Sequence, residues 1–116
     1  MTDCLFCKIV TKAIPATLVY EDDRALAFDD INPQAPAHAL VIPRVHIATL
    51  DEIRPEHEAI VGHLYTVASK VAAQKGLING YRTVMNCGPD GGQSVFHLHV
   101  HLLGGRALGW PPFPRN

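Results

Sequence analysis

The sequence predicts an α+β fold in which a five-stranded antiparallel sheet is covered by one long helix, with a short helix near the N-terminus. Short apolar segments separated by turn residues predict the strands. A single apolar stripe at helical spacing, over residues 60–72, predicts the long helix. The 116 residues leave room for one domain, spanning 1–116. Packing the stripe on one face of the sheet gives a layered domain.

The N-terminal half is predicted to hold the short helix and three strands. Pro15 ends the helix, because proline cannot continue the helical hydrogen bonding. A turn at residues 22–24 separates the first two strands, and Pro43 stops the third. The expected elements are a helix at Phe6–Lys12 and strands at Thr17–Glu21, Ala25–Asp29 and His38–Ile42.

The C-terminal half is predicted to hold the long helix and two more strands. Thr49–Glu52 has the form of a capping box that opens a helical turn, and Pro55 suits a first helical position. Gly76 suits the C-terminal end of the helix. The stripe consists of Ile60, Val61, Leu64, Val67, Ala68, Val71 and Ala72. The last strands are expected at Tyr81–Asn86 and Val95–Leu103, on either side of a glycine-rich turn.

Composition and charge exclude several classes of protein. The net charge is -1 and no run of Lys and Arg is present, so nucleic acid is not expected as a partner. No apolar run reaches the roughly 20 residues that span a bilayer, so no membrane association is expected. The N-terminus lacks the pattern of a signal peptide, which predicts a cytoplasmic protein. Because disulfides are rare in that reducing compartment, Cys4 and Cys7 are expected to be thiols or metal ligands.

Three histidines at alternate positions are the strongest chemical signal. On one strand, His97, His99 and His101 project from the same face, at intervals of roughly 6.6 Å. Three imidazoles are costly to bury without partners, so this pattern favours a functional site over a coincidental solvated face. The residues expected on the opposite, core-facing side are Phe96, Leu98, Val100 and Leu102.

Two kinds of chemistry fit this spacing. A His-x-His pair can chelate a catalytic metal, as in zinc or cupin-like sites. Alternatively, one histidine is a nucleophile and the others handle protons without a metal. The preceding turn contains Gly88, Gly91 and Gly92, which allow backbone amides to approach an anion, followed by neutral Gln93 and Ser94. This surrounding suits a phosphoryl group better than a hard metal ion.

Residues 97–103 also match the pattern His-φ-His-φ-His-φ-φ, with φ apolar, throughout. By this motif the chain resembles the histidine-triad (HIT) family, and the likeness extends from Cys4 to Pro112. Its segments at 27–36, 38–43, 90–94, 104–106 and 110–112 are similar to the nucleoside phosphoramidase, or Hint-like, branch. The resemblance implies a HIT-like fold. It also implies hydrolysis of purine nucleoside phosphoramidates through a nucleotidyl-histidine, releasing AMP or GMP and an amine.

The resemblance implies a role for each site residue. His99 matches the nucleophile, and His101 matches the histidine that contacts phosphate and assists proton transfer. His38 matches a residue that supports the nucleophile's orientation and tautomer, and Ser94 one that binds the leaving group and phosphate. Further phosphate-side matches are Asn86, Gly92 and Gln93. The nucleoside pocket maps to Phe6, Ile9, Phe28, Ile31 and Leu40 around the base, which are equally good core residues, and to Asp30 on the ribose hydroxyls.

The pair Cys4-Leu5-Phe6-Cys7 is a separate signal. A CxxC motif by itself is redox-active, metal-binding or accidental. Some similar proteins bind zinc through it with two histidines, which here map to His46 and His97. Such a closed Cys2His2 site is structural, because it has no open position for catalysis, and no cofactor is expected to be required for catalysis. Three further residues are expected outside the site, with Cys87 a packed thiol on the fourth strand and His57 and His63 on the surface of the long helix.

The family forms two-fold homodimers in which helices and sheets of two protomers join. The apolar stripe at 60–72 suits either a core or such an interface. Trp110 lies in a segment that, by resemblance, reaches toward the neighbouring active site and shapes leaving-group preference. The competing functions are a nucleotide-binding regulatory protein with vestigial catalysis, a dinucleoside polyphosphate hydrolase and a catalytic-metal hydrolase. The intact His99, Ser94 and His38 favour the enzyme.

Overall fold

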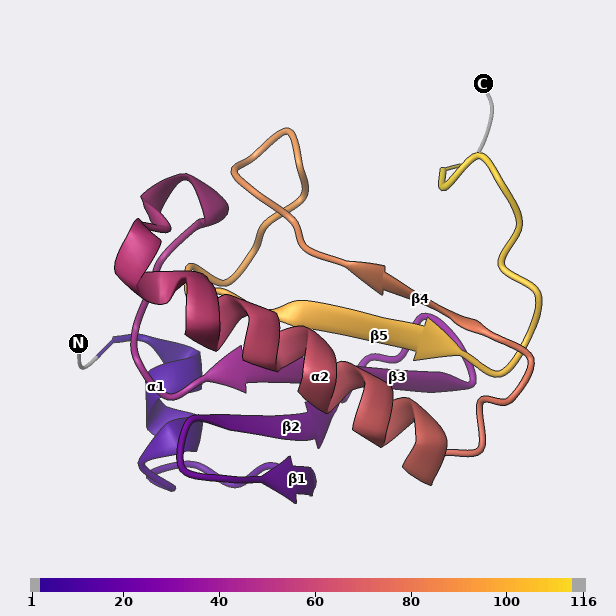
Figure 1. Cartoon of the computed structure of the whole chain (residues 1–116), viewed down its shortest axis with the longest axis horizontal. Coiled ribbons are helices and arrows are strands. Elements are labelled where there is room, and N and C mark those ends of the chain that lie inside the picture. Colours follow the sequence, from indigo (N-terminus) through magenta and orange to yellow (C-terminus); the bar gives the residue numbers. More distant parts are fainter. Residues whose placement is uncertain (1–2, 114–116) are drawn as a thin grey trace.

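The computed structural model describes residues 3–113, and these form one antiparallel five-stranded sheet with helices on both faces (Figure 1). The strand order is β1-β2-β3-β5-β4, with β1 and β4 at the edges. The strands are β1 (Leu18–Glu21), β2 (Ala25–Asp29), β3 (Ala37–Pro43), β4 (Tyr81–Val84) and β5 (Val100–Gly104). The helices are α1 (Leu5–Val10) and α2 (Glu58–Gln74), with single 3-10 turns η1 (Leu50–Glu52) and η2 (Pro55–His57). The predicted α+β fold is confirmed.

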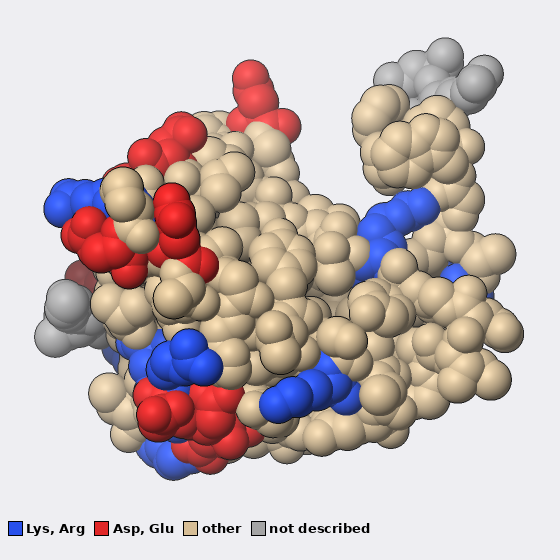
Figure 2. Space-filling model, viewed as in Figure 1, with Lys and Arg blue, Asp and Glu red and all other residues tan. Residues whose placement is uncertain are grey.

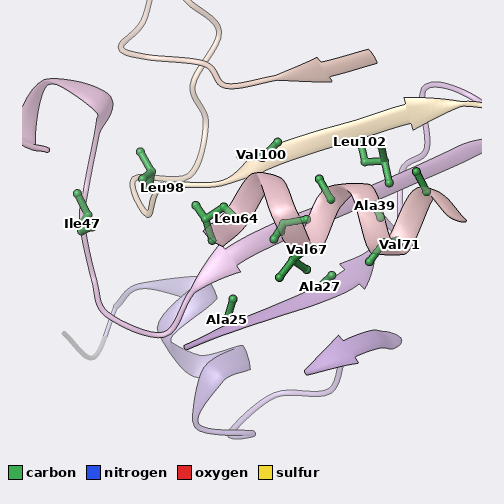
Figure 3. Close-up of a cluster of buried hydrophobic side chains, with 13 residues drawn as sticks. Ala25, Ala27, Ala39, Ile47, Leu64, Val67, Val71, Leu98, Val100 and Leu102 are labelled. Atoms are coloured by element: carbon green, nitrogen blue, oxygen red, sulfur yellow. The ribbon is translucent and has the colours of Figure 1, made fainter. Parts of the chain in front are cut away.

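Alternation along the central strands gives the sheet two buried faces. On β3, Ala39 and Val41 belong to the core beneath α2, whereas Leu40 and Ile42 belong to the core beneath α1. Figure 3 shows the larger core, where α2 side chains such as Leu64 and Val67 meet those of β2 and β5. Both helix-covered faces are therefore apolar, and the second face is the one that carries the site.

The apolar stripe on α2 forms part of the protein core. Leu64, Val67, Ala68, Val71 and Ala72 are buried, and Ile60 and Val61 pack against the same cluster at its margin. Of the two predicted alternatives for this stripe, core or interface, the structure shows the core. None of the helices within residues 3–113 is both long enough and apolar enough to span a membrane.

Several predicted boundaries were wrong for local reasons. Helix α1 ends before Lys12, whose φ of 65° lies in the left-handed region. Thr49 makes no side-chain cap, so the predicted capping box is absent. Instead, His57 Nδ1 accepts a hydrogen bond from the backbone amide of Arg54, 3.0 Å away, ahead of α2. Pro55 opens the 3-10 turn η2, and α2 begins after it.

The segment before the last strand lies outside the sheet. Strand β4 ends at Val84, so Cys87 lies in the loop that follows it, and β5 begins at Val100 instead of Val95. The amide of Leu98 donates to Ile47 O at 2.7 Å and not to β3. Because strand alternation does not extend that far, Phe96 is 49% exposed, contrary to the core position predicted for it.

His63 was predicted on the surface, but its side chain is only 11% exposed. Its Nε2 lies 2.6 Å from Asp22 Oδ2, and Arg24 Nη2 lies 3.2 Å from its Nδ1. The ring of His63 thus lies between a carboxylate and a guanidinium of the same turn. This contact ties α2 to the β1–β2 turn.

Candidate active site and metal centre

The three histidine rings lie on the α1 face of the sheet, as predicted, although only His101 lies within β5. His97 is fully buried, and His99 is 5% exposed. The ring centroids of His99 and His101 are 5.0 Å apart. Phe6 on α1 meets His99 and His97 edge-on, with centroid distances of 5.1 and 6.0 Å. The short helix therefore covers the histidines from one side.

The tautomer of His99 follows from its backbone contact. Its Nδ1 lies 2.7 Å from the carbonyl oxygen of His97. A carbonyl oxygen only accepts, so Nδ1 carries the proton and Nε2 keeps its lone pair. Burial lowers the pKa of His99 below its usual value, which keeps the ring neutral at neutral pH. His99 is therefore a buried neutral imidazole with one unprotonated nitrogen.

His38 and His101 form a second ordered pair. The amide of Gln34 donates to His38 Nδ1 at 3.0 Å, so the His38 proton resides on Nε2. That nitrogen lies 2.9 Å from His101 Nδ1 and 3.4 Å from Asp30 Oδ2. When it donates to His101, the proton of His101 is on Nε2. Burial, reinforced by His99 and His38, lowers the pKa of His101 to about 4.

This geometry corrects one predicted role. His38 was expected to support the orientation and tautomer of His99, but its ring contacts His101. The carbonyl of His97 supports His99 instead. Neither this carbonyl nor the Gln34 amide can be predicted from residue type, because any residue supplies a backbone carbonyl and nearly any residue supplies an amide.

Hydrogen bonds of the Gln93 side chain hold the glycine-rich loop after β4 in its conformation. Gln93 Oε1 accepts from the Gly88 amide at 2.9 Å, and Nε2 donates to the carbonyl oxygens of Ala48 and Val95 at 2.8 and 3.1 Å. Both amide protons of Gln93 are therefore used, so its side chain has no donor left for the predicted phosphate contact. Its backbone amide is also occupied, by Gly88 O. Gln93 holds the loop in shape instead.

Three other loop residues, Asn86, Gly91 and Gly92, also stabilise the conformation of this loop. Asn86 Nδ2 donates to Gly91 O at 2.6 Å. A side chain at Gly91 would collide with the backbone of Cys87, which explains the glycine there. Gly92 has a φ of 79°, in the left-handed region. Ser94 is exposed at the end of this loop, where a ligand has access to it.

The residues predicted to bind the nucleoside fall into three groups. Four of them are buried together between α1 and the sheet, as the core interpretation expects. These are Phe6, Ile9, Phe28 and Leu40. Ile31 is 98% exposed. Asp30 lies beside His38, and its Oδ1 accepts from the Asn32 amide at 2.8 Å.

Trp110, which was expected to shape leaving-group preference, is 81% exposed and lies over the guanidinium of Arg82, on the β4 edge of the sheet.

Cys4, Cys7, His46 and His97 converge as predicted, with donor atoms all within 4.8 Å of one another. Their measured separations are 3.3 Å from Cys4 Sγ to His97 Nδ1, 3.3 and 3.5 Å from Cys7 Sγ to the Nδ1 atoms of His46 and His97, and 3.2 Å between those nitrogens. Tetrahedral zinc with ordinary bond lengths requires donor separations of about 3.3–3.6 Å. The four residues therefore fit a zinc ion.

The surroundings of this cluster also suit a metal. His97 Nε2 donates to Pro43 O at 2.9 Å, which leaves Nδ1 unprotonated toward the cysteines. Without a cation, burial and the neighbouring Cys4 raise the pKa of Cys7 to about 11. A bound cation reverses this effect, because it favours the thiolate.

A metal held jointly by the triad does not fit. His97 Nδ1 faces the cysteines, and His99 Nδ1 donates to a carbonyl. Asp30, His38 and His101 also place donor atoms within 4.8 Å of one another. However, His38 Nε2 carries the proton in that group and cannot ligate. Within the described residues, the three triad histidines therefore do not direct their ring nitrogens at one common metal position.

The fold and the histidine arrangement define a histidine-triad protein, a single α+β domain with an ordered imidazole cluster on one sheet face. A family model described as "HIT domain" matches residues 11–108, and the chain belongs to the HIT family. It is 59% identical over 110 residues to a HIT-like protein of Synechococcus elongatus, covering 95% of this chain and 96% of the relative.

Two further relatives are informative. A 14 kDa zinc-binding protein of Zea mays is 56% identical over 110 residues, with 93% of this chain and 86% of the relative covered. A HIT family hydrolase of Legionella pneumophila has a crystal structure with a TM-score of 0.93 and 49% identity, covering 96% of this chain and 100% of that chain. The fold of this chain is thus that of a HIT family hydrolase.

Proposed function

We propose that this protein hydrolyses the P–N bond of purine nucleoside 5'-phosphoramidates, with His99 as the nucleophile. The observation that carries the proposal is the buried, neutral His99, whose Nδ1–H is fixed by the His97 carbonyl and whose Nε2 lone pair is free. A neutral imidazole attacks phosphorus without bringing another negative charge to it. The hydrolase described among the relatives is consistent with this class of reaction.

In the first half-reaction, the His99 Nε2 lone pair forms a bond to phosphorus and the P–N bond breaks. The departing nitrogen keeps the bonding electron pair and takes up a proton from solvent. Neutral His101, whose Nδ1 accepts from His38 Nε2–H at 2.9 Å, keeps its own Nε2–H and donates it as a hydrogen bond to a phosphoryl oxygen. The positive charge left on the nucleotidylated His99 ring is stabilised through Nδ1–H by the His97 carbonyl.

In the second half-reaction, water attacks phosphorus and loses one proton to solvent, and the P–N bond to His99 breaks. The electron pair returns to Nε2, and the nucleoside monophosphate leaves. The two steps consume one phosphoramidate and one water and release one amine and one monophosphate. Ser94, exposed beside the loop, is the residue proposed to bind the leaving group.

Asp30 is proposed to accept hydrogen bonds from the ribose hydroxyls. Asp30→Asn should lower the preference for ribonucleotide over 2'-deoxynucleotide substrates roughly tenfold or more, because a charge-assisted hydrogen bond contributes about 1.5–3 kcal/mol. The ratio of kcat/KM values for matched ribo and deoxy phosphoramidates measures this effect. Because the ratio compares two substrates on the same protein, a loss of rate caused by the changed contact between Asp30 and His38 affects both substrates and cancels.

The neighbouring carboxylate supplies a matched control for Asp30. Asp29 is the last residue of β2, directly before Asp30, but it pairs with Lys75 at 2.7 Å. Asp29→Asn should leave the ribo/deoxy ratio unchanged. An Asp30→Asn protein with the wild-type ratio would show that Asp30 does not contact the ribose.

Zinc is proposed as a structural ion on Cys4, Cys7, His46 and His97. The support is the donor geometry and the hydrogen bond that orients His97, together with the zinc-binding relative from Zea mays. Four protein ligands close the tetrahedron, so the metal has no position for substrate. It links α1 to the segments around His46 and His97.

A two-fold homodimer through the β4 edge is proposed as the assembly. The β1 edge carries Glu21, which pairs with Lys12 and Arg44, and such charges discourage strand pairing. The β4 side is less charged: Tyr81 on β4 and Tyr65 on α2 are 44% and 43% exposed, and Figure 2 shows a mostly uncharged surface over α2 and β4. Pairing there extends the sheet across two copies.

Sedimentation of the protein should give twice the chain mass of 12.7 kDa. Tyr81→Glu should shift the protein to monomer, because it places a buried charge at the pairing edge. Leu18→Glu, on the opposite edge strand β1, should remain dimeric. A wild-type monomer at micromolar concentration would contradict the assembly.

A further inference from the structure

His97 belongs to the metal cluster and to the nucleophile's support at the same time. Its ring Nδ1 lies 3.3 Å from Cys4 Sγ and 3.2 Å from His46 Nδ1. Its backbone carbonyl accepts the hydrogen bond from His99 Nδ1 at 2.7 Å. The residue is fully buried. A displacement of His97 therefore changes the surroundings of His99 directly.

We propose that the metal centre positions the nucleophile. A metal held by the two cysteines, His46 and His97 fixes the His97 carbonyl, and that carbonyl holds His99 in the tautomer with a free Nε2. His97 is thus a positioning residue in addition to a metal ligand. The link to turnover rests on the proposed phosphoramidase function, whereas the link to the His99 tautomer does not.

The backbone around His97 lies outside the sheet, so contacts other than the hydrogen bonds between strands must hold it in place. Strand β5 begins only at Val100, so neither His97 nor His99 is held by the strand ladder. The nearest backbone hydrogen bond joins Leu98 N to Ile47 O at 2.7 Å. Its two partners directly follow His97 and His46, which are both proposed ligands. One metal ion bound to His46 and His97 would therefore hold both of the segments that this hydrogen bond joins.

The His97 ring is oriented toward the cluster by a backbone contact. The hydrogen bond to Pro43 O places the proton of His97 on Nε2, so its Nδ1 lone pair faces inward. His46 Nδ1, 3.2 Å away, also points inward. His46 is exposed, whereas a movement of the buried His97 breaks its contacts with Pro43 and His99.

The test uses His46→Asn, which weakens zinc binding at an exposed position and leaves the other three donors. Zinc is titrated into this protein while nitrogen-15 NMR reports the protonation of each His99 ring nitrogen and kinetics report kcat and KM. We expect a single Nδ1–H tautomer at saturating zinc and mixed tautomers without it. We also expect kcat to fall at least about tenfold on zinc removal, since a misplacement of about 1 Å costs up to 10²-fold. KM should change less than twofold.

Three outcomes distinguish the proposals. If the His99 tautomer and kcat follow the zinc-binding curve, the coupling is supported. If folded, zinc-free protein keeps the Nδ1–H tautomer and its kcat, the coupling is overturned. If the tautomer follows zinc but no phosphoramidate turns over at any zinc level, the coupling stands and the proposed function fails.

A control separates positioning from general destabilisation. Val71→Ala removes buried methyl groups from the opposite core beneath α2. It should lower the Tm while leaving the His99 tautomer and kcat at their wild-type values. If Val71→Ala alters the tautomer as much as zinc removal does, the effect is not specific to the metal centre.

Discussion

His99→Ala is expected to abolish turnover of adenosine 5'-phosphoramidate. Removal of a covalent nucleophile typically costs about 10⁴–10⁶ in kcat, because no other group makes the bond to phosphorus. Nucleotide binding should persist, since the proposed ribose and phosphate contacts come from other residues. Steady-state kinetics and calorimetric titration with AMP measure the two effects separately.

His57→Ala provides the comparison for this loss. His57 lies in the η2 turn before α2, outside the site, and its ring contacts the Arg54 amide. This variant should keep its turnover within about twofold per folded molecule. Retention of a tenth of wild-type turnover by His99→Ala would exclude His99 as the nucleophile.

Loss of the metal site should produce the largest change in stability. Replacement of Cys4 and Cys7 by serine is expected to abolish zinc binding and to lower the Tm by at least about 10 °C, or about 2–3 kcal/mol, because the binding energy of a structural zinc is folding energy. Elemental analysis should find about one zinc per chain in the wild-type protein. Calorimetry of wild-type and variant proteins measures the shift.

The third cysteine gives the matched control. Cys87 is a free thiol outside the metal cluster, so Cys87→Ser should retain zinc and most of the wild-type stability. Wild-type protein without zinc, and with a Tm equal to that of the double variant, would leave the CxxC motif as two ordinary thiols.

Much of the fold was predictable because burial imposes periodicity on the sequence. The stripe on α2 follows the 3.6-residue period, and its central members are the buried ones. The short strands β2 and β3 are nearly continuous apolar runs, since helices cover both faces of the central sheet. The triad spacing likewise predicted the shared face of His97, His99 and His101.

The remaining errors concern contacts between distant segments. The start of β5 depends on whether Leu98 pairs with β3 or with Ile47, and local propensity does not distinguish these partners. The burial of His63 depends on Asp22, 41 positions away. Gln93 carried an amide suited to phosphate, but Ala48 and Val95 use both of its donor protons.

The backbone groups that orient the site histidines also could not be predicted from the sequence. The carbonyls of Pro43 and His97 and the amide of Gln34 set the protonation of three histidines. These groups have no residue-type signature, so only the folded chain identifies them. The cluster of Cys4, Cys7, His46 and His97 was expected from the resemblance to zinc-binding members of the family, and the four side chains do converge.

Trapping of the covalent intermediate tests directly whether His99 is the nucleophile. Wild-type protein mixed with adenosine 5'-phosphoramidate is quenched in base within one turnover, because N-phosphorylated histidine is labile in acid, and is then digested and analysed by mass spectrometry. The proposed mechanism predicts an adenylyl group on the peptide that contains His99, attached to Nε2 and absent from the His99→Ala protein. Efficient turnover with no adduct, or an adduct on another residue, would contradict it.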